Sequence, residues 1–315
     1  MTDAKIVFLG TPEFAVASLE ALVENGFSVV AVVTAPDKPA GRGLKLTESA
    51  VKRYAMGKNI PVLQPVKLKD PDFLEKLRSF QADIQVVVAF RMLPELVWAM
   101  PRLGTVNLHG SLLPQYRGAA PINRAIMNGE TITGVTTFKL QQEIDTGNIL
   151  LQEEIPIGAD ENAGELHDRM KKTGAALTVM TVRELIFDEL TEKPQPVKAS
   201  HDLKTAQKIF AEDCVIQWSD STKKIYDQIR GLSPYPGAFT LFNGKMMKIF
   251  RSKQELIRHG RVPGLIDIET NQLFRFTTSD GYIYPEDLQP EGKKRMSVTD
   301  FLRGYRGNEH QNKVK

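Results

Sequence analysis

The chain has 315 residues, of which 42% are hydrophobic and 25% are charged, and its formal net charge is +3. This composition excludes a disordered or fibrous protein, and the length predicts two domains, because a single hydrophobic core rarely grows so large. The one cysteine, Cys214, excludes an internal disulfide and cannot by itself hold a structural zinc ion. The sequence has neither a signal-peptide pattern at its N-terminus nor an apolar run long enough to span a membrane, so we expect a cytoplasmic protein.

Apolar runs bounded by turn residues recur through the first half of the chain. These runs are typical of buried parallel strands, and they cover residues 5–9, 28–34, 84–90 and 105–108. Residues 12–25 have a helical pattern, with Thr11 as the N-cap, Pro12 at the first helical position and Gly26 at the end. Strands that alternate with helices predict a doubly wound, mostly parallel α/β sheet of the Rossmann-like kind over residues 1–190.

The pattern changes in the last third of the chain. A long helical stretch, residues 163–190, leads into a polar segment with two prolines, residues 191–207, which predicts a linker. Beyond it, Asn243-Gly244 predicts a hairpin turn between two short strands. Five short β-type runs and one helix predict a small barrel of the oligonucleotide-binding type over 208–315: strands at 215–219, 238–242, 245–251, 264–268 and 273–278, and a helix at 222–231.

Positive charge is concentrated toward the C-terminus. Residues 201–315 carry 19 Lys and Arg against 14 Asp and Glu, whereas residues 1–200 carry 22 against 24. An excess of this kind is typical of a domain that binds a polyanion, although a solvated surface with a chance excess fits equally well.

The segment TVNLHGSLLP, residues 105–114, is the most informative part of the chain. Apolar residues alternate with Asn107 and His109, so a strand here turns the amide and the imidazole to the same side. Both side chains then lie at the C-terminal end of a strand, where open α/β sheets bind ligands. Acyl transfer needs such a pair, because an amide can donate to the oxyanion and an imidazole can move protons. An isolated Asn-x-His also fits a structural histidine beside a turn.

A carboxylate follows in the segment EIDTG, residues 143–147, after a predicted strand at 133–140. Asp145 in this segment is placed to reach His109, and such a contact would fix the imidazole tautomer and favour its protonated form. Asp in an Asp-x-Gly turn is also common local turn chemistry.

The strings HGSLLPQYRGAAPI, EIDTG and GTPEF resemble the folate-dependent formyltransferases, and the likeness runs along nearly the whole chain. The resemblance implies that Asn107, His109 and Asp145 are the catalytic residues. It also implies that the formyl group of 10-formyltetrahydrofolate passes directly to the α-amino group of methionyl initiator tRNA, with no covalent enzyme intermediate. On this basis residues 1–190 form the catalytic domain and residues 208–315 the tRNA-binding domain. We expect a monomer without a metal ion.

Two segments are expected at the folate site. Ser111, Leu112, Leu113 and Pro114 match the family segment beside the tetrahydrofolate, and the resemblance places Phe90, Arg91 and Met92 at the wall that accommodates the pterin. Many family members have Gly-x-Ile-Leu-Pro after the aromatic residue. This chain has Arg-Met-Leu-Pro and is one residue shorter, so the individual pterin contacts stay open, and a solvated loop charge is the alternative for Arg91.

The loop APDKPAGRGLKL, residues 35–46, is long, rich in glycine and cationic. Its length is typical of a functional loop, although a solvated loop is the plain alternative. Resemblance to the family loop that engages the acceptor end of tRNA puts Arg42 at the centre of this site, flanked by Lys38 and Lys45. Lys204 and Lys208 are expected to contribute to a positive surface that binds tRNA phosphates.

Other functions fit part of the same pattern. Sister enzymes with the same Asn, His and Asp formylate an amino sugar nucleotide or glycinamide ribonucleotide, or hydrolyse the formylfolate. A plain nucleic-acid-binding protein is the alternative from another class. The turn GTPEF, residues 10–14, has neither a full G-x-G-x-x-G nor a Gly-Lys-Ser/Thr, so we expect no bound dinucleotide or ATP.

Overall fold

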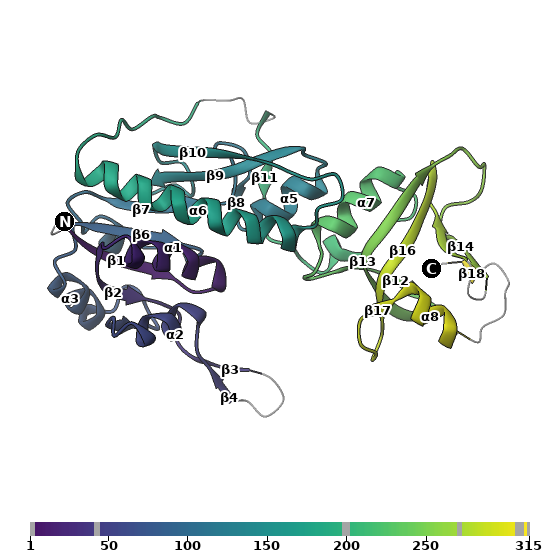
Figure 1. Cartoon of the computed structure of the whole chain (residues 1–315), viewed down its shortest axis with the longest axis horizontal. Helices are drawn as coiled ribbons and strands as arrows, with labels where there is room; N and C mark the ends of the chain where they lie inside the picture. Colours follow the sequence, from purple (N-terminus) through teal and green to yellow (C-terminus); the bar gives the residue numbers. More distant parts are fainter. Residues whose placement is uncertain (1–3, 41–44, 197–201, 270–272, 306–311, 314–315) are drawn as a thin grey trace. The chain divides into compact units, whose positions relative to one another are not determined.

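The computed structural model describes residues 4–40, 45–196, 202–269, 273–305 and 312–313 (Figure 1). The chain forms two compact units whose segments interleave along the sequence. The first unit comprises Met1–Gly118, Thr133–Pro156 and His167–Thr205, and the second comprises Ala119–Ile132, Ile157–Leu166 and Ala206–Lys315.

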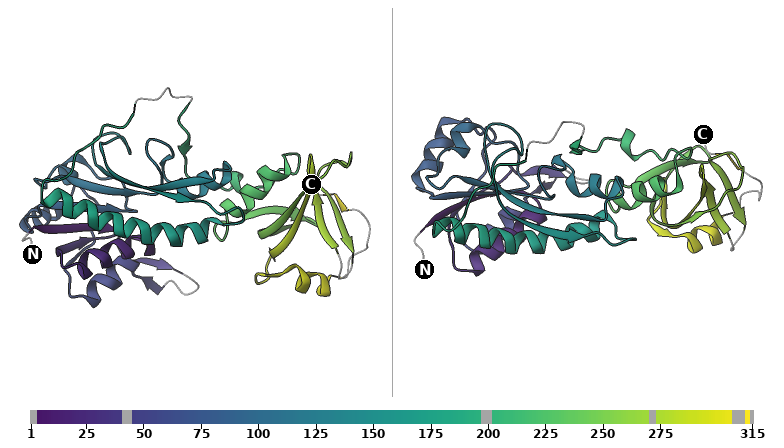
Figure 2. Two further views of the ribbon diagram at one scale, coloured as in Figure 1. Left: turned by 45° about the horizontal axis from the view of Figure 1, so that its top comes forward. Right: turned by 90° about the horizontal axis from the view of Figure 1, so that it is seen from above.

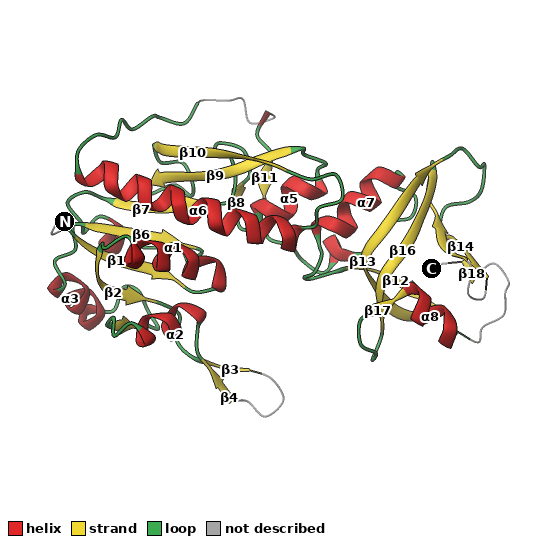
Figure 3. Ribbon diagram, in the orientation of Figure 1, coloured by secondary structure: helices red, strands yellow, loops and turns green. Residues whose placement is uncertain are grey.

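A seven-stranded sheet organises the first unit, in the order β10-β9-β7-β6-β1-β2-β5 (Figure 3). Its strands are β1 (Lys5–Gly10), β2 (Ser28–Val33), β5 (Val62–Leu63), β6 (Ile84–Val88), β7 (Thr105–His109), β9 (Ile132–Lys139) and β10 (Ile149–Pro156). The pairs from β5 to β7 are parallel, and β9 runs antiparallel to β7. The predicted mostly parallel, Rossmann-like sheet is confirmed.

Helices pack on both faces of this sheet. They are α1 (Glu13–Glu24), α2 (Ala50–Gly57), α3 (Pro71–Ser79), α4 (Glu95–Trp98) and α6 (Ala163–Ile186). Apolar residues of α3 and α4 share one buried cluster with Val7, Leu9 and Val87 of the sheet. The other face receives α6, which runs along the sheet (Figure 2) and meets β7 closely. A Cβ on Gly174 would lie 2.7 Å from Leu108 Cδ2, so only glycine allows this approach.

The first helix begins one residue later than its sequence predicted. Pro12 is the N-cap of α1, in an extended conformation with ψ of 176°, and none of the described side chains caps the helix. The prediction of Thr11 as the cap was therefore wrong; proline lacks an N–H and suits the position before the first turn as well as the first turn itself. The predicted end is confirmed, because Gly26 follows the C-cap residue with φ of +77°.

The second unit is built on a curled antiparallel sheet in the order β12-β13-β16-β15-β14-β18, with β17 paired to β16. The strands are β12 (Ala238–Phe242), β13 (Lys245–Leu256), β14 (Leu265–Glu269), β15 (Leu273–Thr277), β16 (Gly281–Pro290), β17 (Met296–Ser297) and β18 (Asn312–Lys313). The helices are α5 (Pro121–Met127), α7 (Thr222–Gly231) and α8 (Val298–Gly304). The Asn243-Gly244 hairpin turn is confirmed, with φ of 51° and 74°. The barrel-like fold expected for this part of the chain is confirmed.

The expected strand at residues 215–219 is wrong. In this described segment, the strand pairing is limited to one isolated bridge from Val215 to Phe239. Its alternating burial comes instead from side chains that enter the core, such as Trp218, whose ring stacks on Phe276 with centroids 4.2 Å apart. Alternation in this segment reports burial rather than strand pairing.

Two long strands, β10 and β16, were missed in the sequence. β16 contains Pro285, which lacks a ladder donor and normally argues against a central strand. Register shifts in β13 on both sides of Arg251 adjoin Ser252, the partner of Pro285, and this irregularity accommodates the proline. β10 contains three consecutive exposed residues, 152–154, which hide the alternation expected of a strand.

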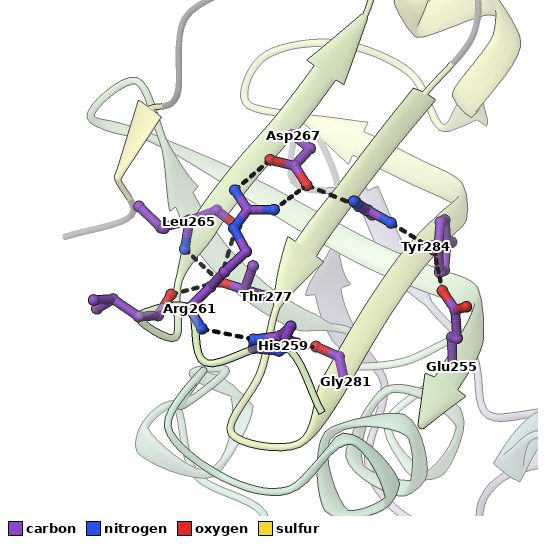
Figure 4. Close-up of polar contacts among 10 residues, drawn as sticks. Glu255, His259, Arg261, Leu265, Asp267, Thr277, Gly281 and Tyr284 are labelled. Carbon is purple, nitrogen blue, oxygen red and sulfur yellow. Dashed lines mark hydrogen bonds and ion pairs between the residues drawn. The ribbon is translucent and has the colours of Figure 1, made fainter. Parts of the chain in front are cut away.

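A carboxylate joins two arginines across the sheet of the second unit (Figure 4). Arg261 binds Asp267 with both terminal nitrogens, at 2.6 and 2.7 Å, and Arg275 Nε binds it at 2.8 Å. Arg275 also lies 3.8 Å from the centroid of the Tyr282 ring and donates to the Tyr284 hydroxyl. Hydrogen bonds from Arg261 hold the pKa of Asp267 below its ordinary value.

We expect Asp267→Asn to lower the free energy of unfolding by about 1–3 kcal/mol at neutral pH, because two arginines lose a charged partner. A carboxylate whose pKa is lower in the folded state stabilises the protein at pH values above its unfolded-state pKa. This stabilisation is lost as the pH falls through the folded-state pKa. The difference from wild type, measured by urea unfolding of the full chain, should therefore persist down to about pH 4 and shrink below it.

Glu286→Gln is the matched control, since it removes a carboxylate from the exposed Lys253 pair on the same sheet. An equal loss of stability in both variants would contradict the role assigned to Asp267.

Candidate active site

Strand β7 presents Asn107 and His109 on the face of the sheet opposite α6. Leu108 between them packs toward Gly174 of α6, so its two neighbours point the other way. Asn107 is half-buried, whereas His109 is only 6% exposed. Among the described residues, no group is hydrogen-bonded to the side-chain amide of Asn107, so the donors of this side chain are available to a ligand.

The His109 ring lies between a carbonyl and a carboxylate. Its Nε2 is 2.8 Å from the Tyr116 carbonyl oxygen, and its Nδ1 is 3.8 Å from Asp145 Oδ2. The first distance is a hydrogen bond, and the second is longer than a hydrogen bond. A carbonyl only accepts, so the first contact requires a proton on Nε2, which leaves Nδ1 facing the carboxylate.

Backbone geometry brings both partners to the ring. The backbone N–H of Gly118 donates to Asp145 Oδ2 at 2.9 Å, which joins the EIDTG turn to the segment after β7. Tyr116 and Asp145 have φ of 59° and 53°, in the left-handed region that residues other than glycine seldom adopt. Such conformations persist where surrounding contacts enforce them, and they are frequent at functional sites.

The SLLP segment, Ser111 to Pro114, is a tightly bonded turn. Thr136 of β9 donates to the Ser111 carbonyl at 2.6 Å and accepts from the Leu113 N–H at 3.2 Å. Ser111 is fully buried, and its hydroxyl donates to the Gln115 carbonyl at 2.6 Å. Leu113 and Pro114 are buried too, whereas Leu112 is half-buried. These four residues therefore shape the turn more than they expose polar groups.

The second expected folate segment follows β6, which neighbours β7 in parallel register, so both segments leave the same edge of the sheet. Phe90 is half-buried and packs against the cluster under α3 and α4. Arg91 donates to the carbonyl oxygens of Pro65 and Val66. Met92 is 70% exposed. Arg91 is exposed, and two backbone carbonyls hold its guanidinium.

The expected tRNA-binding residues are placed only in part. Arg42 lies outside the described residues. Lys38 is exposed on β3 (Lys38–Ala40), which pairs with β4 (Lys45–Thr47), the strand in which Lys45 stands. Lys204 and Lys208 are exposed as well.

No local motif in the sequence indicates what anchors the base of this hairpin. Lys52 Nζ binds Asp37 Oδ2 at 2.5 Å, and Gln64 Nε2 donates to Asp37 Oδ1 at 2.8 Å. The Lys52 hydrogen bond is the largest cause that lowers the pKa of Asp37. Common residue types far apart in sequence make these contacts, so no local motif marks them.

The described residues contain neither a group of metal-ligating side chains nor a membrane-spanning helix. Across those ranges, no three or more His, Cys, Asp or Glu side chains gather as metal ligands would. Nor does any helix in them have the length and apolar character of a membrane span.

Comparison with known proteins assigns both parts of the chain. A model of the formyl transferase family matches residues 4–182, and a model of the formyl transferase C-terminal domain matches residues 208–306. A relative from Bacteroides fragilis is 49% identical over 309 residues, covering 96% of this chain and 95% of its own length. Another, from Parabacteroides distasonis, is 51% identical over 313 residues, covering 96% of both chains. Both are named methionyl-tRNA formyltransferase.

Solved structures share the fold at lower identity. An N-formyltransferase from Helicobacter canadensis, in complex with folinic acid and dTDP-3-aminofucose, superimposes with a TM-score of 0.67 at 22% identity, covering 90% of this chain and 99% of its own. HypX from Aquifex aeolicus, in complex with tetrahydrofolic acid, gives 0.64 at 18% identity, covering 96% and 48%. The family match over more than half of the sequence and the two relatives at 49% and 51% identity show that the chain belongs to the formyl transferase family.

Proposed function

We propose that this chain transfers the formyl group of 10-formyltetrahydrofolate to the α-amino group of methionyl initiator tRNA. One geometric observation carries the chemistry: β7 turns Asn107 and His109 to the same side, and Asp145 approaches the His109 ring. The choice of acceptor is supported by relatives 49% and 51% identical, over 96% of the chain, that are named for this activity. The solved structures support only the fold, because their sequence identity to this chain is too low to indicate the acceptor.

In the proposed reaction the neutral amine attacks the formyl carbon directly. A carbon–nitrogen bond forms, and negative charge develops on the formyl oxygen. The Asn107 amide donates to this oxygen, and His109 stabilises its charge. As the tetrahedral centre collapses, the bond to N10 of the folate breaks, the amine loses a proton and N10 gains one. Asp145 and the Tyr116 carbonyl hold the imidazole in place through this exchange.

For the folate itself, we propose a wall made by the SLLP turn together with residues 90–92. Met92 and Leu112 are accessible enough to contact a ligand, and an exposed methionine packs well against flat rings. Ser111 and Leu113 are buried, so their part is to fix the shape of the turn.

For the acceptor, we propose that residues 1–190 form the catalytic domain, 191–207 the linker and 208–315 the tRNA-binding domain. The family matches at 4–182 and 208–306 support this division. The excess of Lys and Arg after residue 200 suits a polyanion. We further propose a monomeric enzyme that works in the cytoplasm, where charged tRNA is found.

A competition between acceptors tests the proposed function. The protein is incubated with 10-formyltetrahydrofolate, methionyl initiator tRNA and an amino sugar nucleotide. We expect formylmethionyl-tRNA as the product, because the relatives that share half of the sequence are named for it. Formylation of the sugar nucleotide instead would identify a sister enzyme. If neither acceptor is formylated, the alternative of a plain nucleic-acid-binding protein is favoured.

Replacement of His109 by Ala should lower kcat by about 10²-fold or more, the usual scale for the loss of one group that stabilises an oxyanion. The measurement is the initial rate of tRNA formylation under saturating conditions. His167→Ala is the matched control, since that histidine lies on α6 and is 38% exposed. Full activity of the His109 variant would show that the catalytic assignment is wrong.

Replacement of Arg42 by Ala should raise the KM for methionyl-tRNA and leave the affinity for formylfolate nearly unchanged. Loss of one phosphate contact should also reduce, by about 1, the slope of the logarithm of the tRNA binding constant against the logarithm of the salt concentration. Arg78→Ala, on the exposed side of α3, controls for the loss of one surface charge. Equal damage to both substrates would refute the placement of Arg42 at the tRNA.

A further inference from the structure

Two stretches of the proposed linker, on either side of residues 197–201, are bonded to the candidate active site or to the ends of the strands that flank the Asp145 turn. Upstream, Lys193 pairs through its backbone with Ile149, at 2.7 and 2.9 Å, and Glu192 binds Lys139 Nζ at 2.5 Å. Downstream, the Lys204 carbonyl accepts from the Tyr116 N–H at 2.6 Å. The linker therefore does not leave the first unit at the end of α6.

Gln195 makes the most specific of these contacts. Its Nε2 donates to the carbonyl oxygens of Asp145 and Gly147, at 2.7 and 2.9 Å. Its Oε1 accepts from Arg117 Nε and Nη2, at 3.1 and 2.5 Å. One amide thus uses both of its donors and both of its lone pairs. All four hydrogen bonds go to the two loops that supply the neighbours of His109.

Arg117 stands between the two groups on which the site depends. The residue before it, Tyr116, gives the carbonyl that binds His109, and the residue after it, Gly118, donates to the Asp145 carboxylate. A bond from Gln195 to Arg117 therefore ties the loop after β7 to the Asp145 turn at a second point.

Besides Gln195, the described side-chain bonds that hold the Asp145 turn from a distance are those of Gly118 N–H to its carboxylate and of Asn148 to Glu192. Side chains 141–144 are exposed, and Thr146 bonds only locally, to Gln141 and the Glu143 carbonyl. Segments with exposed side chains and local bonds open easily unless distant contacts hold them. Gln195 supplies two such contacts, to the carbonyls of Asp145 and Gly147, which flank Thr146.

We infer that Gln195 is a positioning residue for formyl transfer: by bonding the Asp145 turn to Arg117, it sets the approach of the Asp145 carboxylate to His109. The inference rests on the proposed function of the site. It makes the linker a part of the catalytic unit as well as a connection to the second domain. Displacement of a catalytic group by about 1 Å can cost on the order of 10²-fold in rate, so a residue without substrate contact can matter.

The test is a double-mutant cycle of Gln195→Met and Asp145→Asn in the full chain. Met keeps the length of the side chain and removes all four hydrogen bonds. We expect Gln195→Met to lower kcat by roughly 10-fold or more, with KM for both substrates changed by no more than about 2-fold. In the Asp145→Asn background the same substitution should cost little, because its effect acts through the carboxylate.

A purely structural linker residue gives another result. Its loss would leave kcat unchanged, or would lower it by the same factor in both backgrounds, and either outcome overturns the inference. Gln207→Met, an exposed glutamine in the same linker, is the matched control and should behave as wild type.

Two further measurements keep the test decisive. If Gln195→Met lowers the unfolding midpoint, Gln195→Glu replaces it in the cycle, since Glu still accepts from Arg117 and loses only the two donations to the Asp145 turn. If the wild type formylates an acceptor other than methionyl-tRNA, the proposed function fails, and the cycle is run with that acceptor. Failure of the inference is then separate from failure of the proposed function.

Discussion

The rest of the candidate site depends on one interaction, the placement of the His109 imidazole between the Tyr116 carbonyl and the Asp145 carboxylate. A nearly buried ring with acceptors beside both nitrogens is held in one orientation. Neither acceptor comes from β7 itself. The strand supplies the ring, and two loops that enter from elsewhere in the sequence supply its partners.

This arrangement explains why so many contacts in the first unit lie between loops. Thr136 bonds to the SLLP turn, Gly118 binds Asp145, and Gln195 binds the Asp145 turn and Arg117. A parallel sheet fixes its strands, but its loops need contacts of their own to stay in place. The proposed chemistry requires preorganised donors, so the loops must be held before the substrate arrives.

Much of the fold followed from local sequence. Apolar runs marked the parallel strands, and the Asn243-Gly244 turn and the α7 helix were found where they were predicted. The misses have physical causes. The central strand β16 was missed because Pro285 normally argues against such a strand, whereas here a neighbouring register shift accommodates the proline. The strand at 215–219 was wrongly predicted because Trp218 is buried by entering the core and not by strand pairing.

The candidate site was predictable only in its polar side chains. Alternation along residues 105–109 puts Asn107 and His109 on one face, which needs no knowledge of the fold. The approach of Asp145 depended on resemblance, because the turn lies 36 positions away in sequence. Backbone groups such as the Tyr116 carbonyl and the Gly118 N–H carry no residue signature. Gln195 looked like part of a polar linker, since its partners, two backbone carbonyls and Arg117, lie 48 or more positions away in sequence.

In the proposed reaction Asn107, His109 and Asp145 act together on one formyl carbon. A crystal structure with a stable formylfolate analogue and a bound acceptor amine is the decisive measurement. We expect the formyl oxygen about 3 Å from the side-chain nitrogen of Asn107, with the His109 ring beside it and Asp145 behind the ring. A formyl group bound away from these three side chains would show that they are not the catalytic residues, whatever the likeness of the sequence to its relatives.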